Sequence, residues 1–195
     1  MEEKKLFMMN TSNVHEMKFG RPQTVLVEGE ARPNGIIVTL GATKEAGGRE
    51  LDHVHAIKEE AMEAVAGKFI VVAPEINAQQ YRKIDGQIGK FVLEVGETYS
   101  AYQLAVLDRM EYSEGYFMNA GALKVGDKVN VQAKGAEGQR FVKASGAVGA
   151  MRVVSIVDLW MPMMLAANDG AAQVGGQDAK LMPATIKMIK VEVEK

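Results

Sequence analysis

The stretch Thr185-Ile-Lys-Met-Ile-Lys-Val-Glu-Val-Glu194 decides the fold class of this chain. Apolar and charged residues alternate one by one from Ile189 to Glu194. Such period-two alternation is typical of a β-strand with one buried face and one solvent face. Because a shift of one residue would turn the whole apolar set to solvent, the pattern also predicts a defined strand register.

Shorter segments with strand character occur along the rest of the chain. They are Lys5–Met9, Thr24–Val27, Ile36–Leu40, Lys68–Ala73, Lys90–Glu94, Gln139–Lys143 and Met151–Leu159. Glycine and proline separate them, as in Arg32-Pro-Asn-Gly35 and Val95-Gly-Glu97, and these residues predict turns. Short strands joined by such turns indicate a mainly β fold, either a small β-barrel or a sandwich.

Two segments carry helical signals. The apolar residues between Ile57 and Ala66 follow helical spacing, and Gly67 is suited to end a helix there. Ser100-Ala-Tyr-Gln103 has the spacing of a capping box and predicts a second helix over residues 101–108. We therefore expect one or two short helices within the mainly β fold.

Three regions of different texture divide the chain. Residues 1–50 have the short, interrupted strands of an extended, loop-rich arm or a small β lobe. Residues 51–112 mix helical and strand signals, and residues 113–195 carry the clearest barrel or sandwich pattern. We expect the second and third regions to form one compact unit. A chain of 195 residues is long enough to bury such a core without disulfides or metal.

The composition argues against several classes of protein. The 23 basic and 25 acidic residues give a net charge of −2, and no basic cluster of the kind that binds nucleic acid is present. The absence of cysteine excludes disulfides and thiolate catalysis, and it fits synthesis in a reducing cytoplasm. No apolar run approaches the roughly 18 residues of a membrane span. We expect neither nucleic acid nor a membrane as partner.

The histidines give weak support for a metal site. His53 and His55 would project from one face if Leu51–Ala56 were a strand, and such a pair can begin a metal site. However, the nearest carboxylates, Glu50 and Asp52, would point the opposite way in that strand. We therefore predict no metal and no cofactor.

No recognisable catalytic motif is present. The glycine pairs in Gly135–Gly138 and Gly146–Gly149 are flanked by strand-like sequence and lack a following Gly-Lys-Ser/Thr, so we interpret them as hairpin turns. The carboxylates from Glu59 to Glu63 are interpreted as the solvated face of a helix. No serine lies in a Gly-x-Ser-x-Gly motif. We predict that the chain is not an enzyme.

The most unusual segment is Leu159-Trp-Met-Pro-Met-Met-Leu165, with the only tryptophan and three of the 13 methionines. Methionine fills gaps both in cores and in adaptable contact surfaces. Two interpretations stay open: core packing, or a contact between subunits with the tryptophan as anchor. The predicted interface residues are Trp160, Met161, Met163, Met164 and Leu165. The polar, Gly/Ala-rich residues 166–180 predict a surface loop or arm.

The order of elements from Ile70 to Val157 is similar to that of a known group of proteins. A strand ends in Ala73-Pro-Glu75, and Gly89–Leu93, Val95–Ser100 and the turn at Val125–Asp127 follow. This order resembles small capsid-associated structural proteins of tailed bacteriophages, of the head decoration or head-fibre-like kind. The resemblance implies a virion protein without catalysis that binds the major capsid protein, or other virion proteins, and copies of itself.

Two other functions compete with this expectation. A β-barrel module that binds carbohydrate or a small ligand would need an aromatic platform, and five aromatic residues are close in sequence. They are Tyr99, Tyr102, Tyr112, Tyr116 and Phe117. An enzyme with Asp, Glu and His residues brought together by folding is the third possibility, although no sequence feature favours it.

Overall fold

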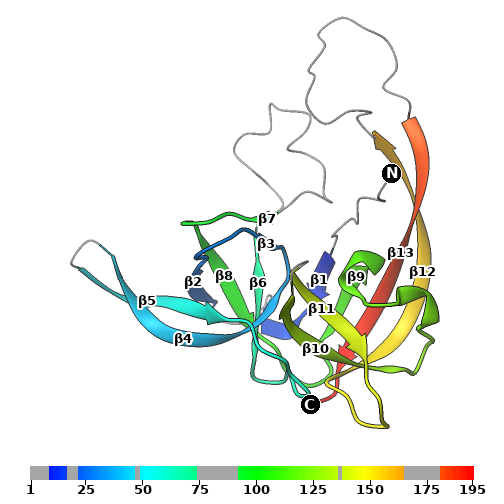
Figure 1. Ribbon diagram of the computed structural model, residues 1–195, viewed down its shortest axis with the longest axis horizontal. Coiled ribbons are helices and arrows are strands. Elements are labelled where there is room, and N and C mark those ends of the chain that lie inside the picture. Colours follow the sequence, from blue (N-terminus) through cyan, green and yellow to red (C-terminus); the bar gives the residue numbers. More distant parts are fainter. Residues whose placement is uncertain (1–8, 17–21, 47–48, 74–91, 136–137, 165–180) are drawn as a thin grey trace, which may run out of the picture.

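The computed structural model describes part of the chain (Figure 1). The described residues are 9–16, 22–46, 49–73, 92–135, 138–164 and 181–195. Within these ranges, the description covers only the backbone at residues 12, 44–46, 49–53, 134–135, 160–164 and 181–184. The described chain is mainly β and contains a small closed barrel, which confirms the predicted fold class.

Five strands close into the barrel, in the order β2-β5-β4-β6-β8. They are β2 (Gln23–Leu26), β4 (Ile37–Ala46), β5 (Arg49–Lys58), β6 (Phe69–Val72) and β8 (Thr98–Gln103). The pair β2–β5 is parallel, and the other barrel pairs are antiparallel. The strands predicted at residues 24–27, 36–40 and 68–73 are confirmed, because each overlaps one of these strands.

A second sheet has the order β1-β9-β13-β12-β10-β11, and its neighbouring strands are antiparallel. Its strands are β1 (Met9–Asn13), β9 (Arg109–Ser113), β10 (Lys128–Gly135), β11 (Gly138–Lys143), β12 (Met151–Met164) and β13 (Leu181–Val193). The strands predicted at residues 139–143, 151–159 and 185–194 are confirmed.

Other predicted strands are shorter in the structure or lie partly outside its description. The segment Lys90–Glu94 contains only the two-residue β7 (Val92–Leu93), which pairs with β3 (Arg32–Pro33). In the segment Lys5–Met9, residues 5–8 lie outside the described residues, and Met9 begins β1. The barrel draws strands from both sides of residue 50, and the division of the chain into three regions stays a prediction.

The predicted helix over residues 57–66 is wrong. Ile57 belongs to β5, and the following residues form a loop. Met62 makes an isolated bridge to Val131, and the Val65 N–H donates to the Lys195 carbonyl at 2.6 Å. Because the loop packs Met62 and Val65 into the core, their helix-like spacing reflects tertiary contacts rather than a helical face.

The predicted helix over residues 101–108 is also wrong. Ser100 lies within β8, where it pairs with Thr24 on one side and Val72 on the other. Pairing on both edges of the barrel strand overrides the local capping signal. Two 3-10 turns follow this segment instead, η2 (Glu114–Tyr116) and η3 (Ala120–Ala122).

One hydrophobic core joins the barrel to the second sheet. Ile37 and Ile70 of the barrel pack in the same buried cluster as Met110, Tyr112 and Ile189 of the sheet. A smaller cluster fills the barrel interior and includes eight buried residues. They are Val25, Val27, Ile36, Val38, Val71, Ala73, Leu93 and Ala101. The barrel and the root of the second sheet therefore form one packed body.

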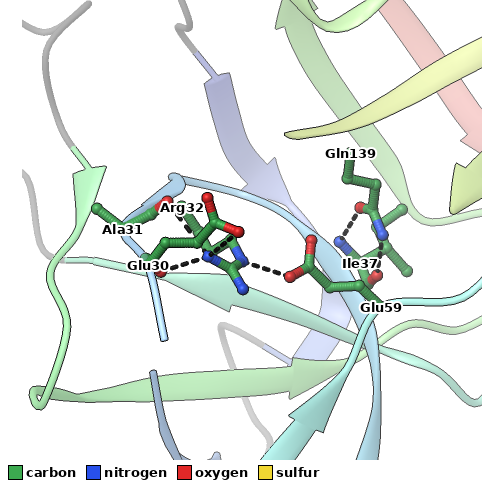
Figure 2. A network of polar contacts seen from close by, with 6 residues as sticks. All are labelled: Glu30, Ala31, Arg32, Ile37, Glu59 and Gln139. Atoms are coloured by element: carbon green, nitrogen blue, oxygen red, sulfur yellow. Dashed lines mark hydrogen bonds and ion pairs between the residues drawn. The ribbon is translucent and has the colours of Figure 1, made fainter. Parts of the chain in front are cut away.

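Two buried polar side chains form hydrogen bonds across the junction between the barrel and the sheet. The side-chain amide of Gln139 accepts from the Ile37 N–H and donates to the Ile37 carbonyl, both at 2.7 Å (Figure 2). It thereby supplies the two hydrogen bonds that a neighbouring strand would otherwise make. The Tyr112 hydroxyl donates to the Gly35 carbonyl at 3.1 Å. Both contacts join β9 or β11 to the start of β4.

Two long hairpins leave this body on opposite sides (Figure 1). One is β4–β5, in which only residues near the base have a third strand, through β2 and β6. The other is β12–β13, the longest strand pair of the described chain. A two-stranded hairpin is marginally stable alone in water, so a contact with another surface would stabilise each of these extensions.

Candidate interaction surface

The outer part of the β12–β13 hairpin is a two-stranded ribbon. Seven residue pairs, from Asp158↔Lys187 to Met164↔Leu181, extend past the last contact with other strands. On the inner side, β9 pairs only with Met188–Glu192 of β13, and β10 pairs only with the start of β12. We call Asp158–Met164 together with Leu181–Lys187 the ribbon. In the described part of the chain, the ribbon has no third strand.

A β-bulge lies at the root of the ribbon. Val153 pairs with Val191, but Ser155 pairs with Lys190, so Val154 is an extra residue in β12. A bulge bends its strand and increases the local twist. It therefore helps β12 to pack in the core at Met151 and leave the body after Ile156.

One face of the hairpin is apolar at the point where it leaves the body. Val157 is 52% exposed and Leu159 is 40% exposed. Their cross-strand partners are Met188 and Ile186, which are buried. The next positions of the same alternation are also apolar. They are Met161 and Met163 on β12, and Ala184 and Met182 on β13.

The predicted interface residues fall within the ribbon or directly after it. The backbone of Trp160, Met161, Met163 and Met164 belongs to β12 and pairs with β13. Their side chains lie outside the described residues, as do Leu165 and residues 166–180 entirely. The choice between core packing and subunit contact for these side chains therefore stays open. The strand predicted at Met151–Leu159 is longer in the structure and continues through Pro162 to Met164.

A buried carboxylate fixes the root of the ribbon. Glu192 of β13 is 3% exposed, and it accepts from Arg109 Nε of β9 at 2.7 Å and from Arg152 Nη2 of β12 at 2.6 Å. The Arg109 hydrogen bond, followed by that of Arg152, lowers the pKa of Glu192. The alternation in the sequence predicts that Glu192 lies on the face opposite to Ile189 and Val191, and this prediction is correct. However, the two arginines cover that face at Glu192.

A group of exposed apolar residues lies in loops at the other end of the six-stranded sheet, and we call this group the loop end. It comprises the four most exposed large apolar side chains of the described chain. They are Val106 (53%), Leu107 (70%), Val125 (65%) and Val148 (63%). These residues come from three loops, which lead into β9, β10 and β12.

Backbone hydrogen bonds bring these three loops to one edge. The Leu107 N–H donates to the Val193 carbonyl at 2.9 Å, and the Gly126 N–H donates to the Val153 carbonyl at 2.8 Å. Ala150, two residues after Val148, accepts from the Glu194 N–H at 3.0 Å. Because Val193 pairs with Met151, all three loops sit where β13 ends and β12 begins.

Leu107 has a backbone conformation that disfavours leucine. Its φ is +74°, and the Asp108 N–H closes a turn to the Ala105 carbonyl at 3.1 Å. Position three of such a turn favours glycine. For a residue with a Cβ, the left-handed region costs about 1–2 kcal/mol. This cost falls on the most exposed large apolar side chain of the described chain, which gains little from burial within its own fold.

A buried ion pair beside the barrel has a structural role. Arg32 Nε donates to Glu59 Oε1, and Arg32 Nη1 donates to the carbonyls of Glu30 and Ala31 (Figure 2). The pair ties β3 to the segment that follows β5. The prediction that Glu59 lies on a solvated helix face is therefore wrong, whereas Glu60 and Glu63 are exposed. Glu60 accepts from the Thr39 hydroxyl at 2.5 Å.

The structure gives no new support to a metal site at His53 and His55. Leu51–Ala56 lies in a strand, as the metal-site argument assumed, and His55 Nδ1 is 3.3 Å from the Gly41 carbonyl. The side chain of His53 lies outside the described residues. Within the described ranges, no group of three or more His, Asp and Glu side chains is arranged to hold a metal ion.

The two glycine pairs have different structures. Gly135 pairs with Gly138 across the β10–β11 hairpin, which confirms the first predicted turn. The hairpin prediction for Gly146–Gly149 is wrong. These residues connect β11 to β12, and those strands lie on opposite sides of β10 rather than next to each other. A Cβ at Gly149 would come 2.7 Å from Lys128 Cβ, so the loop passes close to β10.

The aromatic residues close in sequence do not form an exposed platform. Tyr112, Tyr116 and Phe117 are buried and pack around Phe141, with ring centroids 4.8 Å apart for Tyr112 and Phe141. Burial raises the pKa of both tyrosines above the ordinary value. Tyr99 is half-buried, and its hydroxyl accepts from the Glu94 N–H at 2.7 Å.

No family model, curated protein or solved structure matches this chain. The described residues contain no helix that is long and apolar enough to cross a membrane. Among the described residues, the ribbon and the loop end are the features from which we infer a function.

Proposed function

We propose that the chain is a structural protein of a virus particle, a capsid-associated decoration or head-fibre-like component. In this role it binds the major capsid protein lattice and copies of itself. The observation that carries the proposal is the ribbon, an extension of β12 and β13 with exposed Val157 and Leu159 at its base. The sequence resemblance to phage capsid-associated proteins supports the same function.

The ribbon supports an assembly role for two physical reasons. An isolated two-stranded hairpin is marginally stable in water, and a partner that covers it would supply the missing packing. Exposed apolar side chains that continue one face of a strand pair are typical of protein contact sites. Trp160, whose backbone lies in the middle of the ribbon, is the residue type most often found as an energetic anchor of interfaces.

The binding module for carbohydrate or small ligands lacks a specific observation in its favour. Its aromatic platform needed Tyr112, Tyr116 and Phe117 at the surface, and these residues pack in the core. We therefore propose the structural role and not the ligand-binding role.

Peptide mass spectrometry across a density gradient of particles from the biological source tests this proposal. We expect the chain to peak with the major capsid protein at a fixed copy ratio. In particles that carry Trp160→Ala, we expect less of the chain in the particle fractions. A chain that stays in the soluble fractions of the wild-type gradient would contradict the proposal.

A further inference from the structure

Two prolines lie directly opposite each other in the ribbon, which extends from the body in Figure 1. Pro162 of β12 pairs in register with Pro183 of β13, and the pairing of the two strands is unbroken from Ser155 to Met164. Proline has no backbone N–H and cannot donate a hydrogen bond to a neighbouring strand. The side to which the backbone of each proline points therefore determines which strand loses a donor.

Hydrogen bonds of the folded body fix this direction on β13. In an antiparallel strand, the N–H and C=O of one residue point to the same side, and successive residues alternate. The Val193 N–H donates to the Asp108 carbonyl, and the Leu107 N–H donates to the Val193 carbonyl, both at 2.9 Å. Val193 therefore points away from β12. The paired residues of β13 follow one another without an extra residue, so Pro183, an even number of positions earlier, also points away from β12.

A separate set of hydrogen bonds gives the same result for β12. The Val153 N–H donates to the Asp127 carbonyl, and the Gly126 N–H donates to the Val153 carbonyl, both at 2.8 Å, so Val153 points away from β13. The bulge then adds Val154, and beyond it the even-numbered residues of β12 point away from β13. Pro162 is one of them. The nitrogen atoms of both prolines therefore lie on the two open edges of the ribbon.

Few backbone groups of the ribbon remain open to an added strand before the prolines are reached. Two residues on each strand point both their N–H and their C=O to the open edge. They are Asp158 and Trp160 on β12, and Thr185 and Lys187 on β13. A strand added to either edge would meet a missing donor at the proline, which would interrupt its ladder. Asp158 and Lys187 are also charged, and charged side chains are another common protection of edge strands.

The other long hairpin interrupts its edges in a different way. β4 and β5 contain no proline. Their pairing shifts register between Leu40 and Thr43, and again between Thr43 and Lys44. Such irregularities twist an edge and break its row of bonding groups. The described ribbon has no register shift between Ser155 and Met164, so the prolines interrupt edges that are otherwise regular.

We propose that the Pro162–Pro183 pair blocks both open edges of the ribbon against the addition of another strand. A regular open edge is a template on which sheets grow between copies of a chain. With these edges blocked, the ribbon contacts other molecules through its faces, and copies of the chain do not join into a continuous sheet. This inference concerns the ribbon itself and does not depend on the proposed virion role.

Replacement of both prolines tests the block. Pro162→Thr together with Pro183→Thr restores the two outward N–H groups, and threonine suits a strand while being more polar than proline. We expect the thioflavin T fluorescence of a concentrated solution to rise at least tenfold above that of wild type, with an infrared band of intermolecular β-sheet. Either substitution alone opens one edge and is expected to give a smaller rise.

Two further variants separate an opened edge from a general change in strand propensity. Ala184→Thr places threonine next to Pro183, at a position whose N–H points to β12, and is expected to behave as wild type. Thr185→Pro in the Pro183→Thr variant moves the proline two residues along the same edge. It is expected to return the fluorescence to the wild-type level. Near-ultraviolet circular dichroism of every variant shows whether the body remains folded.

Three outcomes would overturn the proposal. The first is a folded double variant whose fluorescence equals that of wild type, because the prolines would then be tolerated without blocking an edge. The second is an equal rise in Ala184→Thr, which leaves both edges closed. The third is sheet growth that occurs only after the body has lost its near-ultraviolet signal. None of these results bears on the virion role, which the density gradient tests separately.

Discussion

The two ends of β13 show what separates the folded body from the ribbon. Near its C-terminal end, Ile189, Val191 and Val193 are fully buried in the shared core, and Glu192 is held by two arginines. Toward the ribbon, the apolar residues of β13 change to the opposite face, at Met188 and Ile186, which are buried, whereas their partners Val157 and Leu159 on β12 are exposed. The core face of β13 is fully covered within the chain, and the opposite, apolar face at the start of the ribbon is only partly covered. This difference places most of the stability in the body, and we expect association, if the proposed role holds, to use the ribbon.

Truncation of a core aromatic residue should have the largest effect on stability. Tyr112→Ala removes a fully buried ring that packs on Phe141 and Tyr116. We expect a loss of about 3–5 kcal/mol in the free energy of unfolding, measured by chemical denaturation. Tyr112→Phe is the matched control and should lose about 1 kcal/mol, because only the hydroxyl, with its contacts to the Gly35 carbonyl and Met110 Sδ, is removed. Similar losses in the two variants would contradict this account of the core.

Gly35→Ala tests the crowded junction where β4 begins. Gly35 has a φ of +82°, and a Cβ there would collide with the Met9 side chain and come 3.3 Å from the Tyr112 ring. We expect a loss of about 2–3 kcal/mol. Gly29→Ala is the matched control, since its φ is +80° and a Cβ would meet no atom within 4 Å. The control should lose about 1 kcal/mol from backbone strain alone, and an equal loss in both would rule out the crowding.

Glu192→Gln tests the link between β9, β12 and β13. The variant keeps the shape but loses the charge that both arginines contact, and we expect a loss of about 1–3 kcal/mol at neutral pH. The folded-state pKa of Glu192 lies below its unfolded value, because the two arginines stabilise the carboxylate. Its contribution is therefore fully present above the unfolded pKa and disappears as the pH falls through the folded pKa. The gap in unfolding free energy between wild type and variant should close toward acid pH; a gap independent of pH would contradict this assignment.

Leu159→Ser should have the smallest effect on the isolated chain. The side chain is exposed within the ribbon, so we expect a change within about 0.5 kcal/mol in the free energy of unfolding. The same substitution should weaken association in ultracentrifugation, because it removes apolar area from the contact face. A loss of stability comparable to that of a core truncation would place Leu159 in the body rather than in an interaction surface.

The sequence predicted the strands more reliably than the other elements. The alternation from Ile189 to Glu194 was sufficient to identify β13, because its period is set by local geometry alone. The helix prediction at Ser100 failed because pairing on both sides, with Thr24 and Val72, overrides a local cap. The sequence does not indicate that Glu59 is buried, because its partner Arg32 is 27 residues away in sequence and only the fold brings the two together.

The candidate surfaces differ in how far sequence could locate them. The Trp160 segment was singled out by composition, and the structure adds that β12 continues through it as a paired strand. The loop end had no local signal, because Leu107, Val125 and Val148 come from three separate loops. The sheet order brings them to one edge, and the positive φ of Leu107 is set by a turn without glycine.

Amide hydrogen exchange of the chain, dilute and concentrated, tests the contrast between body and ribbon most directly. In dilute solution, we expect slow exchange at Ile189 to Val193 and fast exchange at Asp158 to Met164, because the latter have no third strand in the described chain. On association, the ribbon amides should become protected while those of the body change little. A ribbon that is already as protected as the body in the dilute monomer would contradict the account.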